Sequence, residues 1–398
     1  MQISIFPGKL SGNIQAISSK SQAHRMLICA ALSDMPCKIT CPDTNDDIEA
    51  TVSCLNEMGA NILREGTIYS ISPIKSVPKE ATLNCRESGS TLRFLLPLAG
   101  ALGIQATLLM GGRLHKRPLS PLWEEMERMG CHLTRPTENT VRCTGKLHPG
   151  HYEIDGGISS QFITGLLIAL SVLPGKSSLQ INGTLQSKPY VDITRDVMSM
   201  FGIDVKDTHI EGQYPLREVQ NLSVEGDWSN AAFFLVANAL GSEISISNLN
   251  PNSLQGDREI AILLSLLENS ITVDVAQIPD LMPILSVLAA AKKGAMFTNI
   301  QRLRTKESDR VQSVEEMLKN MGIRTEVTED TFTVYPGEFQ SCTVSSYNDH
   351  RIAMSAAIAA TVATGPITIL NAECVRKSYP AFWVDYRKLG GNYEQLER

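Results

Sequence analysis

Six segments of the chain repeat one pattern of polar and apolar residues. Each begins with a polar stretch that often carries Ser or Asp, continues into an apolar run rich in small residues, and is often followed by Gly and a strand-like run. The starts lie roughly 50 to 70 residues apart, a spacing typical of one supersecondary unit used repeatedly. The six segments begin at Ser19, Ser88, Ser159, Asp227, Ile278 and Asn348.

A second, amphipathic helix with apolar residues at helical spacing and a terminal Gly is predicted in most units. These helices are expected at residues 46–59, 122–130, 194–202, 308–322 and 382–390. Strands are expected after the first helices, at residues 106–110, 178–181, 243–247 and 367–370. The first helices are apolar nearly all round, which is typical of buried helices. The pattern therefore predicts a mixed α/β fold with six buried helices in two sets of three.

The length of 398 residues exceeds that of one ordinary core, so two domains are expected. Residues 214–219 contain a Pro and alternating charges and are interpreted as a linker before the fourth unit. The N-terminal strand is expected to pair within the C-terminal half. The predicted division is a discontinuous domain of residues 1–16 and 219–398 and an inserted domain of residues 17–218, with three units in each.

Charge and composition exclude several classes of protein. A net charge of −6 provides no broad basic field, so a general nucleic-acid binder is not expected. The N-terminus lacks the basic start and apolar core of a signal peptide, and no apolar run reaches the roughly 18 to 20 residues that span a bilayer. Local basic clusters in an acidic protein instead favour small, multiply charged ligands.

Nine cysteines are scattered along the chain without a Cys-x-x-Cys motif or a His-rich spacing. A zinc site is therefore not predicted, and the pair Cys37 and Cys41 is a weak metal signal. An odd cysteine count without a disulfide pattern favours a reducing cytoplasm.

Residues 302–310 form the most highly charged stretch, with six charged residues among nine. A strand-like run at 295–300 precedes it and an amphipathic helix is expected at 311–321. On a helix, Lys306 and Arg310 would share one face and oppose the macrodipole. An anion bound between them would remove this cost, whereas a solvated turn whose charges pair among themselves is the alternative.

Other polar clusters lie at the predicted helix starts. Ser19, Lys20 and Ser21 are followed one turn later by Arg25, and similar clusters occur at 159–161 and 349–351. Residues 113–117 and 376–377 add positive charge. Ser-rich starts are also ordinary N-caps, so the recurrence of these clusters, more than any one of them, predicts a shared anion site. Asp280 lies at the start of an apolar helix, where it is interpreted either as an N-cap or as a base.

Signatures of other enzyme classes do not occur in the sequence. No Gly-x-Gly-x-x-Gly follows a strand, and Leu170 occupies the position that the first Gly of a P-loop needs before Gly175-Lys176-Ser177. Neither His-Glu-x-x-His nor Gly-x-Ser-x-Gly is present.

Seven ordered motifs resemble those of the 5-enolpyruvylshikimate-3-phosphate synthase family of the shikimate pathway, which serves aromatic amino-acid biosynthesis. The likeness runs from Pro7-Gly8 to Leu389-Gly390-Gly391. The motifs are Ser19-Lys20-Ser21 with Arg25, Arg117-Pro118, Ser159-Ser160-Gln161, Ser187-Lys188-Pro189-Tyr190, Ile278-Pro279-Asp280, Lys306-Glu307-Ser308-Asp309-Arg310 and Asp349-His350-Arg351.

The resemblance implies the enolpyruvyl transferase fold, with two domains of three βαβαββ units and ligands in the cleft between them. It also implies transfer of the enolpyruvyl group of phosphoenolpyruvate to the 5-hydroxyl of 3-phosphoshikimate, with release of phosphate. The residues implied for 3-phosphoshikimate are Lys20, Ser21, Arg25, Ser159, Ser160, Gln161, Ser187, Tyr190, Asp280 and Lys306. Those implied for phosphoenolpyruvate are Lys20, Gly89, Arg117, Gln161, Arg310, Arg351 and Lys377.

The chemistry of the residues is compatible with this function. Each substrate carries a carboxylate and a phosphate, giving roughly six negative charges in total. The chain offers seven cations at matching positions, namely Lys20, Arg25, Arg117, Lys306, Arg310, Arg351 and Lys377. Asp280 is expected to be the base for the hydroxyl, and Glu307 and Lys20 are candidates for transferring the methylene proton. Fixed cations can stabilise the developing charges, so we expect neither a metal nor another cofactor.

Two positions depart from the family pattern. Glu87 lies where many members carry Asn, and Arg302 lies where some carry Asn. These departures place an acid beside the expected phosphoenolpyruvate site and a different side chain near the expected shikimate contact.

Two alternative functions remain open at this point. A UDP-N-acetylglucosamine enolpyruvyl transferase would call for a Lys-Asn pair near the N-terminus and a loop cysteine, whereas this chain has Lys20-Ser21 and no cysteine in residues 111–118. A non-catalytic phosphate-binding relative would lack the acid and base residues, and an RNA-end-processing relative would need ATP and a metal. The expected protein is a cytoplasmic monomer that closes around small anionic substrates, with no nucleic-acid or membrane partner.

Overall fold

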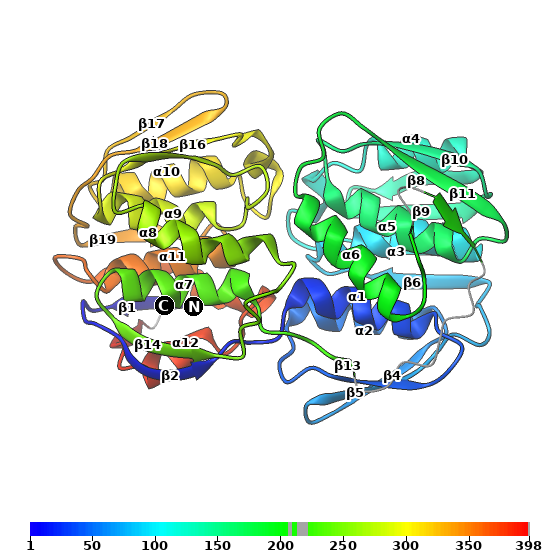
Figure 1. Ribbon diagram of the computed structural model, residues 1–398, viewed down its shortest axis with the longest axis horizontal. Coiled ribbons are helices and arrows are strands. Elements are labelled where there is room, and N and C mark those ends of the chain that lie inside the picture. The colour runs from blue at the N-terminus through cyan, green and yellow to red at the C-terminus, as the bar shows by residue number, and fades with distance from the viewer. Residues whose placement is uncertain (206–208, 213–221, 397–398) are drawn as a thin grey trace. The chain divides into compact units, whose positions relative to one another are not determined.

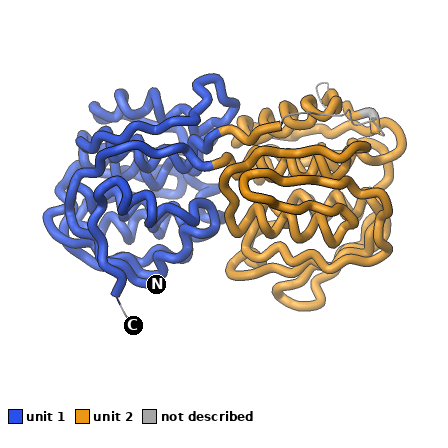
Figure 2. Tube along the Cα trace, turned by 90° about the horizontal axis from the view of Figure 1, so that it is seen from below, with its two compact units in different colours: residues 1–17, 226–398 blue, residues 18–225 orange. Residues whose placement is uncertain are grey.

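The computed structural model describes residues 1–205, 209–212 and 222–396, and it divides the chain into two compact units (Figure 2). Unit 1 comprises Met1–Ile17 and Gly226–Arg398, and unit 2 comprises Ser18–Glu225. The first boundary lies one residue after the predicted one. The second predicted boundary, between residues 218 and 219, and the predicted linker at 214–219 lie outside the described residues.

In its described residues, unit 2 contains six α-helices and eleven strands distributed over three sheets (Figure 1). Its helices are α1 (Lys20–Ala31), α2 (Asp46–Glu57), α3 (Gly89–Leu102), α4 (Leu122–Arg128), α5 (Ser160–Ser171) and α6 (Lys188–Met200), with a 3₁₀ helix η1 (Leu114–Lys116). Its strands are β3 (Cys37–Thr40), β4 (Asn61–Glu65), β5 (Ile68–Ser72), β6 (Glu80–Asn84), β7 (Gln105–Leu109), β8 (Cys131–Thr137), β9 (Thr140–Gly145), β10 (His151–Asp155), β11 (Lys176–Asn182), β12 (His209–Glu211) and β13 (Leu222–Ser223).

Unit 1 is built in the same way around three sheets (Figure 1). Its helices are α7 (Trp228–Ala239), α8 (Ile260–Leu266), α9 (Met282–Ala291), α10 (Arg310–Asn320), α11 (His350–Ala360) and α12 (Phe382–Lys388), with 3₁₀ helices η2 (Gly256–Glu259), η3 (Gln301–Thr305) and η4 (Ala372–Lys377). Its strands are β1 (Gln2–Ile5), β2 (Ser11–Gln15), β14 (Glu243–Ser247), β15 (Ile271–Asp274), β16 (Ala295–Thr298), β17 (Thr325–Val327), β18 (Thr331–Val334), β19 (Cys342–Ser345), β20 (Ile367–Leu370) and β21 (Tyr393–Leu396).

Four of the sheets share one strand arrangement, which confirms the repeat predicted from sequence. In the order β6-β7-β9-β8, the first pair is parallel and the other two are antiparallel, and the order β15-β16-β18-β17 repeats this arrangement. The orders β13-β3-β5-β4 and β19-β20-β1-β21 do the same. In the repeats with consecutive parallel strands, a buried helix forms the crossover, as parallel pairing requires.

Two strands are exchanged between the sequence repeats. Strand β2 precedes α1 of unit 2, but it pairs in parallel with β14 of unit 1. Strand β13 precedes α7 of unit 1, but it pairs in parallel with β3 of unit 2. The N-terminal strand β1 also pairs with β20 and β21. This pairing makes unit 1 discontinuous in sequence.

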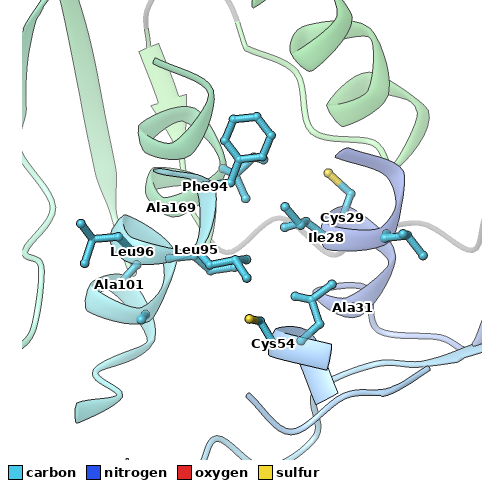
Figure 3. Packing of buried hydrophobic residues seen from close by; sticks show 14 of the residues in the cluster. Ile28, Cys29, Ala31, Cys54, Phe94, Leu95, Leu96, Ala101 and Ala169 are labelled. Carbon is cyan, nitrogen blue, oxygen red and sulfur yellow. The ribbon is translucent and has the colours of Figure 1, made fainter. Parts of the chain in front are cut away.

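Each unit has its own apolar core around its first helices. In unit 2, Figure 3 shows Ile28 of α1, Cys54 of α2 and Leu95 of α3 within one buried cluster. Helix α5 packs closely on α3 at Gly165, where an added Cβ would lie 2.2 Å from the carbonyl oxygen of Arg93. A side chain at this position would separate the two helices. In unit 1, α7, α9 and α11 pack against one another and are almost wholly buried.

The predicted second helices are present, with shifts at their ends. The helix predicted at 194–202 begins six residues earlier, because Pro189 occupies the first turn and does not interrupt it. Helix α10 begins at Arg310 and ends at Asn320. Gly59, Gly130, Gly202, Gly322 and Gly390 all have positive φ just after the second helices, as predicted for helix termination.

Candidate functional site

The start of α1 in unit 2 carries a paired lysine. Ser19 is the N-cap, and its side chain accepts a hydrogen bond from the backbone N–H of Gln22. Lys20 is the first residue of the helix, and its Nζ lies 2.9 Å from Asp47 Oδ2 at the start of α2. This carboxylate offsets the unfavourable placement of a cation at a helix N-terminus. Sequence analysis did not identify Asp47.

Arg25 connects three helices of unit 2 from a buried position, with an exposed fraction of 2%. Its Nη1 donates to the carbonyl oxygen of Ser21 at 2.6 Å, and its Nε donates to Thr194 Oγ1 in α6 at 2.7 Å. Its Nη2 donates to Thr164 Oγ1 in α5 and to the carbonyl oxygen of Tyr190. Burial lowers the pKa of Arg25 to about 10, so the side chain stays charged at neutral pH. The guanidinium of Arg25 therefore joins α1, α5 and α6, the three helices whose starts carry predicted phosphate-binding residues.

Two arginines lie over the start of α3. A Cβ added to Gly89 would lie 2.5 Å from Arg117 Nη1 and 2.7 Å from Arg93 Nη1, so only Gly allows both guanidinium groups to approach the helix N-terminus. Arg93 Nη1 also donates to Gln161 Oε1 at 2.9 Å, and Gln161 Nε2 donates to Ser90 Oγ at 3.0 Å. Two cations beside the positive end of a helix form an anion-binding arrangement.

The predicted residues at the starts of α5 and α6 have different roles in the fold. Ser159 is the N-cap of α5 and accepts a hydrogen bond from the backbone N–H of Gln161, while Ser160 is the first residue of the helix. Ser187 precedes α6 with a φ of 54° and makes no side-chain cap. A positive φ is unusual for a residue with a side chain and marks a constrained backbone position. Ser187 is followed by Tyr190, whose carbonyl oxygen accepts from Arg25.

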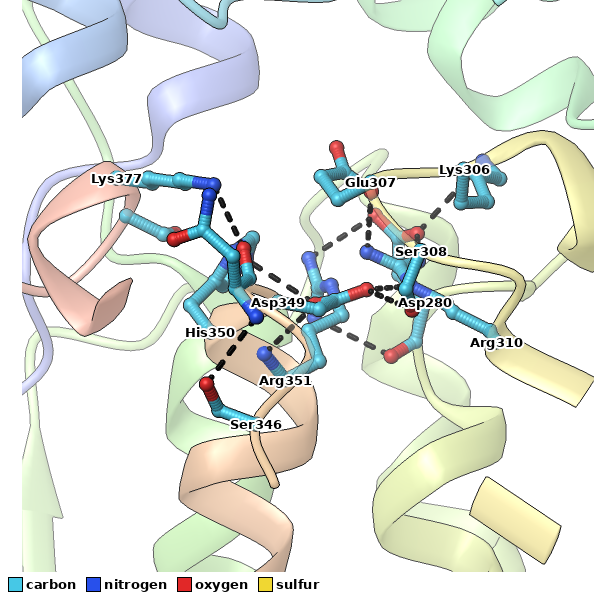
Figure 4. A network of polar contacts seen from close by, with 12 residues as sticks. Asp280, Lys306, Glu307, Ser308, Arg310, Ser346, Asp349, His350, Arg351 and Lys377 are labelled. Atoms are coloured by element: carbon cyan, nitrogen blue, oxygen red, sulfur yellow. Dashed lines mark hydrogen bonds and ion pairs between the residues drawn. The ribbon is translucent and has the colours of Figure 1, made fainter. Parts of the chain in front are cut away.

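In unit 1, Asp280 lies among three cations (Figure 4). Its Oδ1 lies 2.7 Å from Arg310 Nη1 and its Oδ2 lies 2.9 Å from Arg351 Nη2. Lys306 Nζ is 3.8 Å from Oδ1. Burial opposes ionisation, but Arg351, Lys306 and Arg310 outweigh it and hold the pKa of Asp280 well below its ordinary value. The N-cap interpretation was wrong, because the N-cap of α9 is Leu281 and no side chain caps this helix.

Arg310 is compensated within unit 1. Its Nη1, Nη2 and Nε contact Asp280, Glu307 and Asp349 at 2.7, 2.6 and 2.9 Å, and the side chain is 1% exposed. The expectation that Lys306 and Arg310 share a helix face was wrong, because α10 begins at Arg310 with Asp309 as its N-cap. The predicted charge pairing within the stretch is present between Glu307 and Arg310.

Lys306 and Glu307 lie between η3 and α10 with their side chains partly exposed. Burial lowers the pKa of Lys306 to about 8; the charge of Asp280 raises it, and Arg302 and Arg310 lower it further. The ammonium group is therefore still mostly protonated at neutral pH. Glu307 holds its carboxylate against Arg310 Nη2.

The start of α11 provides the remaining predicted residues of unit 1. Asp349 is the N-cap, accepts from the backbone N–H of Arg351, and also receives hydrogen bonds from Ser308 and Arg310. Lys377, at the end of η4, donates to the carbonyl oxygen of Asn348 at 2.6 Å. Arg351 and Lys377 therefore both border the α11 start.

The structure thus gathers the predicted residues into one group on each unit. On unit 2 they lie at the starts of α1, α3, α5 and α6, and on unit 1 they lie around Asp280 and the starts of α10 and α11. Asp47 and Arg93 were not predicted from the sequence. Arg93 had a recognisable signal, because it is a charged residue one turn after Gly89 in an otherwise apolar helix.

The chain was compared with protein families and with known proteins. The model of the family EPSP synthase (3-phosphoshikimate 1-carboxyvinyltransferase) matches residues 6–385. A 3-phosphoshikimate 1-carboxyvinyltransferase of Clostridium kluyveri is 39% identical over 99% of this chain and 98% of its own length. One of Clostridium botulinum is 38% identical over 98% of each chain.

Solved structures agree with this match. The EPSP synthase of Acinetobacter baumannii superposes with a TM-score of 0.82 at 25% identity, covering 100% of both chains. The enolpyruvyl transferase NikO of Streptomyces tendae has a TM-score of 0.74 over 99% of this chain and 98% of its own, and at 18% identity it bears on the fold alone. The mixed α/β prediction and the enolpyruvyl transferase fold are confirmed. The ordered motifs, the repeated sheets and the family match over nearly the whole length lead to one conclusion: this chain belongs to the EPSP synthase (3-phosphoshikimate 1-carboxyvinyltransferase) family.

Proposed function

We propose that the protein transfers the enolpyruvyl group of phosphoenolpyruvate to the 5-hydroxyl of 3-phosphoshikimate and releases phosphate. The family match supports this activity. The observation that carries the proposal within the molecule is the Asp280 carboxylate held beside Arg310, Arg351 and Lys306. Addition of a hydroxyl to an anionic enol requires a base that removes the hydroxyl proton and fixed cations that stabilise the negative charge. The Asp280 cluster places both at one position.

The low pKa of Asp280 gives substrate binding a chemical role. In the free protein, the neighbouring cations stabilise the carboxylate so strongly that it is a weak base. The anionic groups of the two substrates, bound to Lys306 and to Arg351, offset part of this positive field. The pKa of Asp280 therefore rises when the reacting hydroxyl is in place, which makes proton removal easier in the complex.

The proposed reaction proceeds by addition and then elimination. Asp280 takes the proton of the 5-hydroxyl while the oxygen of this hydroxyl bonds to C2 of phosphoenolpyruvate. An acid delivers a proton to the methylene carbon of phosphoenolpyruvate. Glu307 and Lys20 are the proposed acids for this step. Loss of a proton from the resulting methyl group, with departure of phosphate from C2, then restores the double bond in the product.

The residues proposed for 3-phosphoshikimate come from both groups. Arg25, which holds the helices carrying Ser21, Ser160 and Tyr190 together, supports a phosphate position among those helix starts. The full set is Lys20, Ser21, Arg25, Ser159, Ser160, Gln161, Ser187, Tyr190, Asp280 and Lys306. Since Arg25 is buried and already uses its donors within unit 2, we propose that it acts mainly by holding the helix starts.

Phosphoenolpyruvate is proposed to bind where Arg117 approaches Gly89 and where Arg351 borders the start of α11. The full set is Lys20, Gly89, Arg117, Gln161, Arg310, Arg351 and Lys377. Arg93 joins this set as a residue that orients Gln161. Bidentate guanidinium groups suit both the phosphate and the carboxylate of this substrate.

We further propose that one pair of substrates binds to residues of both units and that the protein acts as a monomer in the cytoplasm. A single chain supplies every assigned residue, so the site needs no second copy. All nine cysteines lie in the described part of the chain and are free thiols, which suits a reducing compartment. Among the described helices, none combines the length and the apolar character needed to cross a membrane.

Phosphate release tests the proposed activity. The purified protein is mixed with phosphoenolpyruvate and 3-phosphoshikimate in the presence of a chelator, and each substrate alone provides the control. We expect phosphate release with both substrates only, and no loss of rate in the chelator. Release with UDP-N-acetylglucosamine in place of 3-phosphoshikimate, or no release with either acceptor, would contradict the proposal.

A further inference from the structure

A buried carboxylate lies behind the Asp280 cluster of unit 1. Asp257, in η2, is 3% exposed, and its Oδ2 accepts a hydrogen bond from Ser229 Oγ in α7. No hydrogen-bond partner is recorded for its other oxygen, Oδ1, among the residues that the structure describes. A buried carboxylate with one donor is costly, so packing alone does not account for it.

Ser229 links this carboxylate to Arg351. Arg351 Nη2 donates to Ser229 Oγ at 3.1 Å and to Asp280 Oδ2 at 2.9 Å, while its Nη1 lies 3.2 Å from the carbonyl oxygen of Asp280. The Ser229 hydroxyl can accept from Arg351 in this arrangement because its own proton points to Asp257. A continuous chain of hydrogen bonds therefore runs from Asp257 through Ser229 and Arg351 to Asp280.

The position of Asp257 is itself fixed. The neighbouring Gln255 accepts from the backbone N–H of Trp228 at 3.0 Å and donates to the carbonyl oxygen of Gly226 at 2.8 Å. These two bonds attach the start of η2 to the start of α7, where Ser229 lies. The side chain of Gln255 thus holds Asp257 and Ser229 in register.

The two carboxylates also interact through Arg351. Burial raises the pKa of Asp257 to about 7, the charge of Asp280 raises it as well, and Arg351 lowers it. The pKa of Asp257 therefore depends on the charge of Arg351, the same guanidinium that Asp280 contacts.

We propose that Asp257 is a positioning residue that fixes the Arg351 guanidinium through Ser229 for phosphoenolpyruvate binding. This inference rests on the proposed function, in which Arg351 contacts that substrate. With the Ser229 hydroxyl oriented by Asp257, Arg351 keeps one fixed direction relative to Asp280. Without this constraint, the guanidinium still contacts Asp280 but is less firmly oriented, so part of the binding free energy is used to order it.

A double-mutant cycle tests the chain of contacts. Ser229→Ala and Asp257→Ala are each expected to raise the KM for phosphoenolpyruvate about tenfold, with a smaller effect on the KM for 3-phosphoshikimate. Because both residues act through one path, the double variant is expected to be no worse than either single variant. Asp257→Asn, which keeps an acceptor for Ser229, is expected to recover most of the lost affinity.

Ser286→Ala is the matched control, because Ser286 is a buried serine of α9 whose hydroxyl, within the described part of the chain, donates to Met282 of its own helix. It is expected to leave both KM values unchanged, and thermal unfolding checks that all variants are folded. If Asp257→Ala does not fold, Ser229→Ala and Asp257→Asn still decide between the outcomes.

Three results would overturn the inference: an unchanged KM in the single variants, multiplied effects in the double variant, or an equal rise in Ser286→Ala. A wild-type protein that releases no phosphate would instead reject the proposed function, so the two failures are distinguishable.

Discussion

Arg310 Nη1 donates to Asp280 Oδ1 across 2.7 Å, so the first residue of α10 fixes the carboxylate that precedes α9. The same guanidinium contacts Glu307 and Asp349. The three acidic residues lie on separate segments of unit 1, and Arg310 holds them at defined positions relative to one another. This relation orients the proposed base before any substrate binds.

Replacing the base should lower turnover strongly without abolishing substrate binding. Asp280→Asn keeps the size of the side chain but removes its ability to take a proton, and we expect kcat to fall by about 10²–10⁴-fold. Calorimetry should still detect binding of both substrates, since the cations remain. Asp274→Asn, an exposed carboxylate of the same unit, is the control. Near-normal turnover in Asp280→Asn would remove this residue from the mechanism.

Loss of Arg310 should destabilise unit 1. Arg310→Met leaves Asp280, Glu307 and Asp349 without their shared cation, and removal of one partner of a buried ion pair costs about 3 to 5 kcal/mol. Urea unfolding measures this change in the free energy of unfolding. Lys319→Met, which breaks a surface pair with Glu315, should have little effect. Equal stability of the two variants would contradict the structural role of Arg310.

The pKa of Lys306 predicts how binding depends on pH. Burial lowers this pKa to about 8, so the side chain loses its charge as the pH rises through this value. The second ionisation of the phosphate of 3-phosphoshikimate has a pKa of about 6, so this phosphate is already largely dianionic at pH 7. We therefore expect its affinity to weaken between about pH 7 and 9, as measured by calorimetry.

Lys306→Arg provides the matched variant, because arginine stays protonated throughout this range. Its affinity for 3-phosphoshikimate should be nearly constant between pH 7 and 9. The same decline in both proteins would assign the pH dependence to another group.

A side chain at Gly89 should weaken phosphoenolpyruvate binding selectively. The Cβ of Gly89→Ala would meet Arg117 Nη1 at 2.5 Å and Arg93 Nη1 at 2.7 Å, so both guanidinium tips must move. We expect the KM for phosphoenolpyruvate to rise about tenfold or more, and that for 3-phosphoshikimate to change less. Gly8→Ala adds its Cβ to open space and should change neither value. Equal increases for both substrates in Gly89→Ala would indicate a general distortion.

The repeat and most helix ends could be predicted from sequence because they depend on local patterns. Apolar periodicity marks the buried helices, and the Ser or Asp at the predicted starts of α1, α3, α5 and α7 occupies the N-cap position. The N-cap of α11 is Asp349, one residue after the predicted start at Asn348. Asp280 was misleading because it has the sequence of a cap, while the helix begins two residues later.

The pairing of the N-terminal strand within the C-terminal half was predicted, but side-chain contacts between distant segments were beyond such reasoning. Arg310 finds Asp280 and Asp349 at separations of 30 and 39 residues, and nothing in the local charge pattern indicates these partners. The pairing of β2 with β14 and of β13 with β3 is also set by tertiary contacts. The local sequence does not show it, because either strand could equally pair within the repeat of the helix that follows it. No sequence pattern marked Asp257 as a positioning residue, because its proposed role depends on its hydrogen bond with Ser229, 28 residues away.

We propose that one substrate pair binds residues of both units, with Lys20 and Arg117 on one unit and Lys306, Arg351 and Lys377 on the other. A ligand bearing a phosphate and a carboxylate attracts the cations of both groups. Such a ligand favours a closed arrangement and shifts the population towards it.

Small-angle scattering measures this closure directly, through the radius of gyration of the protein with and without saturating 3-phosphoshikimate. We predict a smaller radius in the presence of the ligand, together with tighter subsequent binding of phosphoenolpyruvate. A radius that stays unchanged at saturating ligand would contradict the account.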